Sequence, residues 1–246
     1  IVHPATGVPG RYYESFAQWM VTERGANVLI YDYRGAGNDP RTSDAIMSDW
    51  GVTDQSAALD HALAQYPDLP VWTVGHSLGG FCLPFHPNAD RVMRHIAVAS
   101  GPALWHQHPW RFTPQVTLFW FVLGPLLTRL MGYLPGKRLG IGADLPPGVF
   151  WQWRRWCTNK RFFEVDWGRE LPQPDLTRMT GAVELIGIAD DVMIPPARVA
   201  LLARYYPSAD VSFQTLRPSD FGLRRAGHIG IFHRSCMPMW SEMVKS

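Results

Sequence analysis

Short runs rich in β-branched and aromatic residues alternate along the chain with longer stretches in which apolar residues recur at helical spacing. The short runs predict five strands, at residues 27–33, 71–76, 94–100, 182–189 and 210–216. The longer stretches predict helices at residues 11–24, 47–66, 79–86, 195–205 and 231–245. Strands that alternate with helices are typical of a mostly parallel sheet with helices on both faces. We therefore expect an α/β fold.

Residues 102–180 depart from this alternation. They contain no clear strand but hold seven tryptophans and several prolines. Such a long interval between two predicted core strands indicates an inserted helical cap, on a core formed by residues 1–101 and 181–246. The tryptophans either form the interior of the cap or line a substrate pocket, and Trp105 and Trp151 are the candidates for the pocket.

The charge balance and the cysteine count exclude several classes of function. The 246 residues carry a formal net charge of +2 and no long run of like charges, so we expect no nucleic-acid partner. Cys82, Cys157 and Cys236 lie far apart and lack the spacing of a disulfide framework or a zinc site. His106 and His108 form a His-x-His pair without a third ligand at suitable spacing, so no metal is expected.

The most apolar stretch, residues 116–134, is about long enough to cross a bilayer. Gly124 and Pro125 interrupt it, however, and Arg129 adds a charge near one end. Amphipathic helices that pack on the domain or contact a membrane surface therefore fit better than a spanning helix. The chain starts IVHPATG, within a strand-like run and without a secretory segment, so we expect a missing preceding segment and a cytoplasmic location.

The sequence GHSLGG, residues 75–80, places Ser77 directly after a predicted strand and before a predicted helix. Small neighbours allow the chain to reverse within about two residues, and such a strained turn lifts a serine hydroxyl clear of the sheet. The interpretation as a tight turn and the interpretation as a nucleophile therefore agree. The backbone N–H of Leu78, at the start of the helix, is the first expected donor to an oxyanion.

A nucleophilic serine needs a base within hydrogen-bonding reach, and the base needs an orienting carboxylate. The segment ADDVMIPP places Asp190 and Asp191 after the strand predicted at 182–189. Asp191 is the better candidate for the acid because its spacing to Pro195 places it just before the next helix, whereas Asp190 suits a turn or a cap. In AGHIGIF, His228 lies between glycines after the last predicted strand and is the candidate base.

The order Ser77, Asp191, His228, each after a successive strand, is that of the nucleophile-elbow hydrolases. The chain resembles the α/β-hydrolase fold superfamily over nearly its whole length, and within it a group of bacterial hydrolases whose substrates are mostly unassigned. Besides GHSLGG, the segment DYRGAG matches the family's D-x-R-G-x-G loop. Asp32 and Arg34 of this segment are expected to fix the loop near the elbow.

The opening VHPATG is similar to the oxyanion loop of that family, with Pro4 where glycine is usual. The resemblance implies that the N–H of Ala5 or of Thr6 is the second oxyanion donor. His76, next to the nucleophile, is a candidate for lining the pocket. The family's first strands are absent from this chain.

The resemblance implies a serine hydrolase that cleaves an ester or a related acyl bond without a metal or an organic cofactor. Because the cap is apolar and aromatic, we expect a small hydrophobic acyl substrate. Thioesterase, lactonase, amidase, carbon–carbon hydrolase and acyltransferase chemistry use the same three residues and stay open, as does a non-catalytic, ligand-binding role. Dehalogenase and epoxide hydrolase activities are disfavoured, because those branches carry aspartate where this chain has Ser77.

Overall fold

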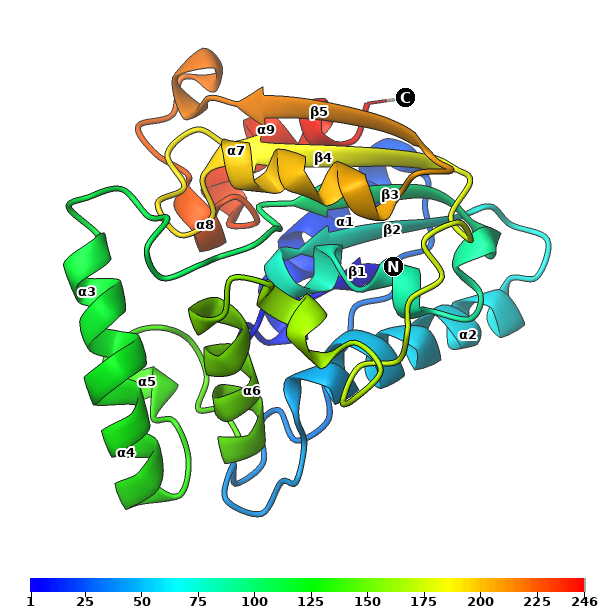
Figure 1. Cartoon of the computed structure of the whole chain (residues 1–246). Helices are drawn as coiled ribbons and strands as arrows, with labels where there is room; N and C mark the ends of the chain where they lie inside the picture. The colour runs from blue at the N-terminus through cyan, green and yellow to red at the C-terminus, as the bar shows by residue number, and fades with distance from the viewer. Residues whose placement is uncertain (246) are drawn as a thin grey trace.

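Five parallel strands form the sheet at the centre of the molecule, and their spatial order is their order along the chain (Figure 1). The computed structural model describes residues 1–245. The strands are β1 (Val2–His3), β2 (Val71–His76), β3 (Val92–Val98), β4 (Ala182–Ile188) and β5 (Asp210–Leu216). The helices are α1 (Glu14–Arg24), α2 (Gln55–Gln65), α3 (Thr113–Leu118), α4 (Gly124–Met131), α5 (Gly136–Leu139), α6 (Pro147–Thr158), α7 (Pro196–Val199), α8 (Gly227–Gly230) and α9 (Met237–Met243). The α/β fold expected from the sequence is confirmed.

Helices cover both faces of the sheet, because each face of a parallel strand carries apolar side chains that must be buried. On one face, Phe16 of α1 and Trp240 of α9 lie in one hydrophobic cluster with Val74 of β2. On the other face, Leu59 of α2 and Val199 of α7 belong to a second, larger cluster. Burial of each such side chain stabilises the fold by about 1.5–3 kcal/mol.

The strand predicted at 27–33 is wrong. Only Ile30 forms an isolated bridge, to Val2. The neighbouring strand β1 is two residues long, so it offers almost no ladder for pairing. Beyond the bridge, the Asp32 carboxylate accepts a hydrogen bond from the Gly10 N–H at 2.7 Å, which draws this segment toward the loop after β1.

The helix predicted after the nucleophile is also wrong. Residues 79–86 fold as parts of two 3-10 turns, Ser77–Gly80 and Leu83–Phe85. Glycines lower helix propensity, and Pro84 lacks the N–H that would continue a helix, so the local sequence does not sustain one. The remaining predicted helices form with irregular ends. The helix predicted at 231–245, for example, is reduced to the shorter α9.

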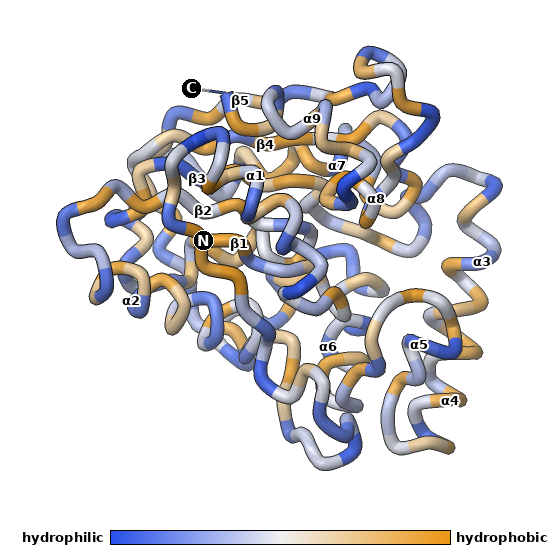
Figure 2. Tube along the Cα trace, turned by 180° about the vertical axis from the view of Figure 1, so that it is seen from behind, coloured by the Kyte–Doolittle hydropathy of each residue, from blue (hydrophilic) through white to orange (hydrophobic). Residues whose placement is uncertain are grey.

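Between β3 and β4 the described chain forms helices α3 to α6 and no strand of the sheet. α3, a π-helical segment at Phe119–Leu123 and α4 follow one another without a break. They lie at the edge of the molecule, and α6 lies closer to the sheet (Figure 1, Figure 2). We call residues 113–131 the outer rod. No helix in residues 1–245 is long and apolar enough to cross a membrane.

The helices of residues 102–180 share a hydrophobic core with the sheet. Trp120 of the outer rod stacks on Phe150 of α6, with ring centroids 6.2 Å apart. Trp156 of α6 contacts Phe81, which follows the nucleophile turn, at 6.2 Å. All four belong to one cluster that also contains Leu185 of β4. The interval therefore packs as part of one interior, and the boundaries predicted at 101 and 181 stay a prediction.

Candidate active site

Ser77 lies at the end of β2, in a backbone turn that closely packed glycines make possible. Its φ is +53°, a left-handed value that is rare for a residue with a side chain and marks local strain. A Cβ atom on Gly75 would lie 2.2 Å from the carbonyl oxygen of Gly79, and one on Gly79 would lie 2.2 Å from that of His3. Ser100, just after β3, donates its hydroxyl to the Ser77 carbonyl oxygen at 2.6 Å and holds the turn in place.

Asp191 and His228 meet at the same edge of the sheet. Asp191 follows β4, and His228 lies in α8 after β5. The His228 Nδ1 lies 2.7 Å from Asp191 Oδ2. The other carboxylate oxygen of Asp191 accepts hydrogen bonds from the N–H groups of Met193 at 2.8 Å and Ile194 at 2.9 Å. The side chains of Asp191 and His228 are both buried. The hydrogen bond between them therefore holds the imidazole in one orientation.

The neighbouring Asp190 has a different set of contacts. Its carboxylate accepts hydrogen bonds from the N–H groups of Ala226 and Gly227, both at 2.9 Å. Asp190 therefore fastens the loop that carries His228, whereas Asp191 contacts the imidazole itself. This arrangement fits the turn role considered for Asp190.

Ser77, Asp191 and His228 all follow carboxyl ends of parallel strands, so the topology brings them to one edge of the sheet. Within residues 1–245, Ser77 Oγ makes no hydrogen bond to the His228 ring. Contacts of this kind are often long in unliganded enzymes and tighten when substrate binds. The hydrogen-bonded pair is the acid and the imidazole, and the serine follows β2, which β3 separates from β4.

The loop after β1 faces the nucleophile turn and is held by two buried tyrosines. The Tyr33 hydroxyl donates to the Pro4 carbonyl oxygen at 2.8 Å, and the Ala5 N–H donates to the Tyr13 hydroxyl at 2.9 Å. The Ala5 N–H is therefore already used, which argues against it as an oxyanion donor. The Thr6 N–H makes no hydrogen bond in the described part of the chain.

His76 is fully buried and forms part of a buried hydrogen-bond network, and its role in lining a pocket stays a prediction. Its Nδ1 lies 2.7 Å from the Tyr13 hydroxyl, and its Nε2 lies 3.0 Å from the carbonyl oxygen of His228. Burial, reinforced by His228, lowers the pKa of His76 well below its usual value, so the ring is neutral. A neutral ring donates from Nε2 to the carbonyl and accepts from Tyr13 at Nδ1. These hydrogen bonds link the loop that contains Ala5, through Tyr13 and His76, to the backbone of His228.

Asp32 and Arg34 fasten different segments of the chain near the site. Asp32 fixes the nearby loop through Gly10, as described above. The Arg34 guanidinium instead pairs with Asp54, 2.7 Å away, at the end of the π-helical segment before α2. Arg34 therefore fastens its own loop to that helix rather than to the nucleophile turn.

The amino-acid sequence matches a family of hydrolases. A family model described as serine aminopeptidase, S33, matches residues 1–141, which is more than half of the chain and includes Ser77. The chain belongs to this family. The match places this S33 hydrolase among the α/β hydrolases, as the GHSLGG and DYRGAG segments indicated. No curated protein is significantly similar to the chain in sequence.

Several solved α/β hydrolases share the fold of this S33 hydrolase. The monoacylglycerol lipase of Paleococcus ferrophilus has a TM-score of 0.55 and 14% identity, over 97% of this chain and 91% of that one. A thermophilic esterase from Thermogutta terrifontis has a TM-score of 0.53 and 16% identity, over 100% and 89%. A lipase-esterase related protein from Clostridium acetobutylicum has a TM-score of 0.58 and 10% identity, over 98% and 91%. At such identities the likeness shows the fold alone.

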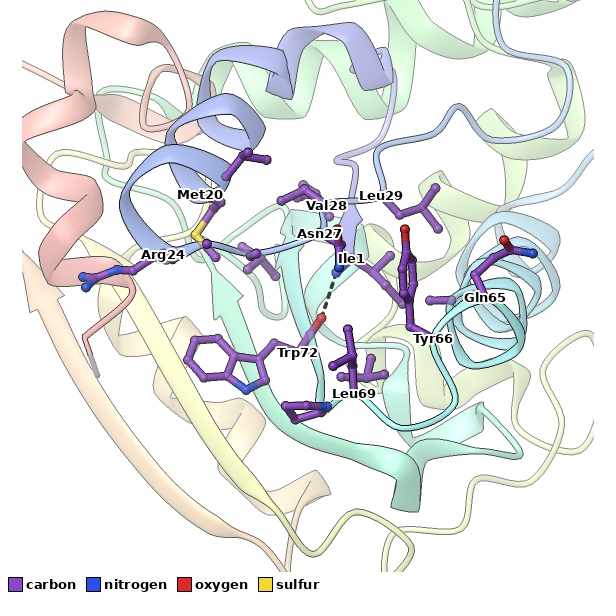
Figure 3. A pocket seen from close by; sticks show the side chains of 18 of the residues that line it. Ile1, Met20, Arg24, Asn27, Val28, Leu29, Gln65, Tyr66, Leu69 and Trp72 are labelled. Atoms are coloured by element: carbon purple, nitrogen blue, oxygen red, sulfur yellow. Dashed lines mark hydrogen bonds between the residues drawn. The ribbon is translucent and has the colours of Figure 1, made fainter.

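Ser77, Asp191 and His228 line neither of the two hollows described in the S33 hydrolase. One, of about 780 Å³, lies around Ile1, whose amino group donates to the Trp72 carbonyl oxygen at 2.8 Å (Figure 3). The other, of about 760 Å³, opens on the outer rod. Neither is lined by Trp105 or Trp151, whose rings contact Phe121 and the Arg129 guanidinium instead. Their role in a substrate pocket stays a prediction.

Residues 1–245 hold neither a cluster of metal-ligating side chains nor an exposed cysteine. Among residues 1–245, no group of three or more His, Cys, Asp or Glu side chains is arranged to hold a metal ion. Cys82, Cys157 and Cys236 are free and buried. Burial raises the pKa of the Cys82 and Cys157 thiols, so neither forms the thiolate that a cysteine nucleophile needs.

Sequence reasoning missed two residues of the site. Tyr13 lies beside a second tyrosine near the start of the first helix. Nothing in this local sequence indicates that the Tyr13 hydroxyl is buried and makes hydrogen bonds to both the Ala5 N–H and the His76 ring. Ser100 is one of several small residues that follow β3. Its position one strand over from Ser77 at the same sheet edge is the signal that points to it.

Proposed function

We propose that this S33 hydrolase is a serine esterase or lipase-like enzyme that cleaves an ester or a related acyl bond of a hydrophobic substrate. The observation that carries the proposal is the strained Ser77 at a sheet edge that also holds the buried Asp191–His228 pair. The neighbours named as a lipase and an esterase support hydrolysis of an acyl bond. We keep the cytoplasmic location predicted from the sequence as part of this proposal.

In the proposed reaction, Ser77 Oγ attacks the acyl carbonyl carbon while His228 Nε2 takes the hydroxyl proton. The charge on the carbonyl oxygen is stabilised by the N–H groups of Leu78 and Thr6. The carbon–oxygen bond to the alcohol then breaks, and His228 returns the proton to the departing oxygen. Water, deprotonated by His228, attacks the acyl-enzyme in the same way and releases the acid. Asp191 holds the imidazole and stabilises its charged form.

The proposal is tested by labelling with a fluorophosphonate probe, which reacts with activated serines. The unmodified protein is expected to be labelled stoichiometrically and to hydrolyse p-nitrophenyl esters, and Ser77→Ala is expected to lose both. Ser100→Ala provides a matched control, because Ser100 supports the turn without being the nucleophile. Full ester hydrolysis by Ser77→Ala contradicts the mechanism. A lack of labelling in the unmodified protein favours the non-catalytic, ligand-binding alternative.

The two aspartates give a second, sharper comparison. Asp191→Asn is expected to lower kcat by about 10⁴-fold, because an amide no longer orients the imidazole or stabilises its charge. Asp190→Asn keeps an oxygen that accepts from the Ala226 and Gly227 N–H groups, so a much smaller loss is expected. Equal losses in the two variants contradict the assignment of Asp191 as the acid. Esters, thioesters, lactones and amides of the same acyl group compared side by side then separate the chemistries that share this mechanism.

A further inference from the structure

The outward side of the outer rod is exposed and almost entirely apolar. Nine residues of 113–131 are exposed, and Gln115 and Arg129 are the polar ones among them. The largest apolar side chains on this side are between 37% and 74% exposed. They form what we call the outer face: Leu118, Phe121, Val122, Leu123, Leu126 and Leu130. A helix side that faces only water normally carries polar residues, so this composition indicates a partner surface.

The exposure of the outer face does not result from loose packing of the outer rod on the rest of the protein. The opposite side of the rod consists of buried residues, among them Val116, Trp120, Gly124 and Thr128. A Cβ atom on Gly124 would lie 2.6 Å from the Phe150 ring, so the rod packs closely on α6. The inner side therefore has its partner within the chain. In both views of the whole chain the outer rod lies at the edge of the molecule (Figure 1, Figure 2).

The segment that contains the outer face carries charges of one sign as far as Asp144, whose carboxylate accepts a hydrogen bond from the Lys137 N–H at 3.0 Å. Residues 102–143 contain four basic side chains, Arg111, Arg129, Lys137 and Arg138, and no Asp or Glu. All four basic residues are exposed, and none forms an ion pair with a carboxylate of residues 1–245. The whole chain has a formal net charge of only +2, so the remaining residues are net negative. Positive charge is therefore concentrated in the segment of the chain whose apolar residues are exposed.

We propose that the outer face and its basic residues dock on an anionic lipid surface, with the rod lying in the plane of the interface. An apolar helix side flanked by Arg and Lys is the combination that such surfaces bind, because acyl chains accept the apolar residues and anionic headgroups attract the cations. A second copy of this chain fits less well. A symmetric contact would bring the same four cations of both copies together without any carboxylate from this segment between them.

Docking of this kind would bring the site close to the lipid. The His108 ring, just before the outer rod, donates from Nδ1 to the Val192 carbonyl oxygen at 3.2 Å, and Val192 adjoins Asp191. The hollow of about 760 Å³ is lined by His108 and by Leu118 and Phe121 of the outer face. The lipid-facing surface is thus continuous with the loop that carries the candidate acid. A hydrophobic acyl substrate drawn from that surface would have a short path to the sheet edge.

The test is flotation of the full chain with vesicles, in the Ser77→Ala background so that no hydrolysis takes place. Phosphatidylcholine vesicles containing phosphatidylglycerol are expected to bind the protein, and pure phosphatidylcholine vesicles are expected to bind it at least tenfold less. Arg111→Gln combined with Arg138→Gln should lower binding by about tenfold or more. Leu126→Gln combined with Leu130→Gln should abolish most of the remainder. Because the assay needs no activity, its outcome is independent of the proposed hydrolase function.

Matched controls keep the result specific to this surface. Arg24→Gln with Arg91→Gln removes two exposed cations elsewhere, and Leu69→Gln replaces a leucine that is 50% exposed in another region. These variants are expected to bind like the parent. Equal binding to both kinds of vesicle, or equal loss in the control variants, overturns the proposal. The proposal is also overturned if the protein binds no vesicles but forms a dimer in sedimentation velocity, and if Leu126→Gln combined with Leu130→Gln dissociates that dimer. In that case a second copy of the chain covers the outer face.

Discussion

A residue held in a left-handed conformation costs the fold of order 1–3 kcal/mol, and Ser77 is such a residue. The cost is tolerated because the surroundings leave the turn no alternative. Backbone oxygens occupy the space where side chains on Gly75 and Gly79 would lie, and Ser100 bonds the Ser77 carbonyl oxygen. The conformation directs the serine away from the strand, so the strain is part of what makes Ser77 available to a substrate.

The Tyr13 hydroxyl is expected to affect turnover, although it lies outside the three proposed catalytic residues. Tyr13→Phe removes the bonds to the Ala5 N–H and to the His76 ring and leaves the aromatic packing in place. We expect kcat to fall by about tenfold with little change in KM, because both the Thr6 loop and the His228 backbone lose support. The free energy of unfolding should fall by about 1–2 kcal/mol. Steady-state kinetics and urea unfolding measure the two effects.

Tyr206→Phe is the control for Tyr13→Phe. Tyr206 is also buried, but its hydroxyl makes no hydrogen bond among the described residues. Its removal should leave kcat unchanged. If Tyr13→Phe lowers stability while kcat and the pH dependence of kcat stay as in the parent protein, Tyr13 has only a structural role.

The elements that were predicted well are those in which burial and chain spacing agree. The runs at 71–76 and 210–216 match β2 and β5 residue for residue, because each is a continuous β-rich run between clear breaks. The loops after such strands follow from the topology, so Ser77, Asp191 and His228 were all found at the sheet edge. The spacing to Pro195 favoured Asp191 over Asp190, but the contact of Asp191 with the imidazole depends on how the loop turns, which the sequence alone does not show.

The errors arose where tertiary contacts outweigh local preference. Residues 27–33 are rich in β-formers, yet the adjacent β1 is too short to pair with them. Pairing partners are a property of the sheet and leave no local signal. Tyr13 was missed for a similar reason, since its two hydrogen-bond partners lie at residues 5 and 76.

Helix α6 is fastened by one buried carboxylate, that of Asp166, which is 1% exposed. Asp166 Oδ2 accepts from Gln152 Nε2 at 2.9 Å and from Arg155 and Trp156, both at 2.7 Å. In Asp166→Asn the amide oxygen can take the place of Oδ2 only if the NH2 group lies where Oδ1 has no hydrogen-bond partner among residues 1–245, and the charge that pairs with Arg155 is lost. We expect the free energy of unfolding to fall by about 2–4 kcal/mol, measured by urea denaturation.

Glu170→Gln is the matched control for this carboxylate. Glu170 also contacts Arg155, at 3.1 Å, but its side chain is 41% exposed. Exposed ion pairs contribute about 0–1 kcal/mol, so a small effect is expected. Similar losses in the two variants would mean that charge near Arg155, rather than the buried network, stabilises α6.

At the scale of the whole molecule, several histidines are buried in the central core. His86 and His95 are at most 1% exposed, and each donates from Nε2 to a backbone carbonyl oxygen, of Gly51 and Gly80 respectively. Burial lowers the pKa of each ring to about 4. In the unfolded chain both have an ordinary pKa of about 6.5. Between these values the unfolded state binds more protons than the folded state.

The free energy of unfolding should therefore be fully present above pH 6.5 and fall as the pH drops toward 4. Between pH 7 and pH 5 the expected loss is about 2 kcal/mol for each of the two histidines, measured by urea denaturation at both values. His86→Gln keeps a donor for the Gly51 carbonyl oxygen but cannot titrate. The stability that this variant loses between pH 7 and pH 5 should therefore be smaller by about 2 kcal/mol, the contribution of one histidine. His61→Gln, at an exposed site, should behave like the parent. Equal stability at pH 5 and pH 7 would mean that these rings take up protons in the folded state as readily as in the unfolded chain.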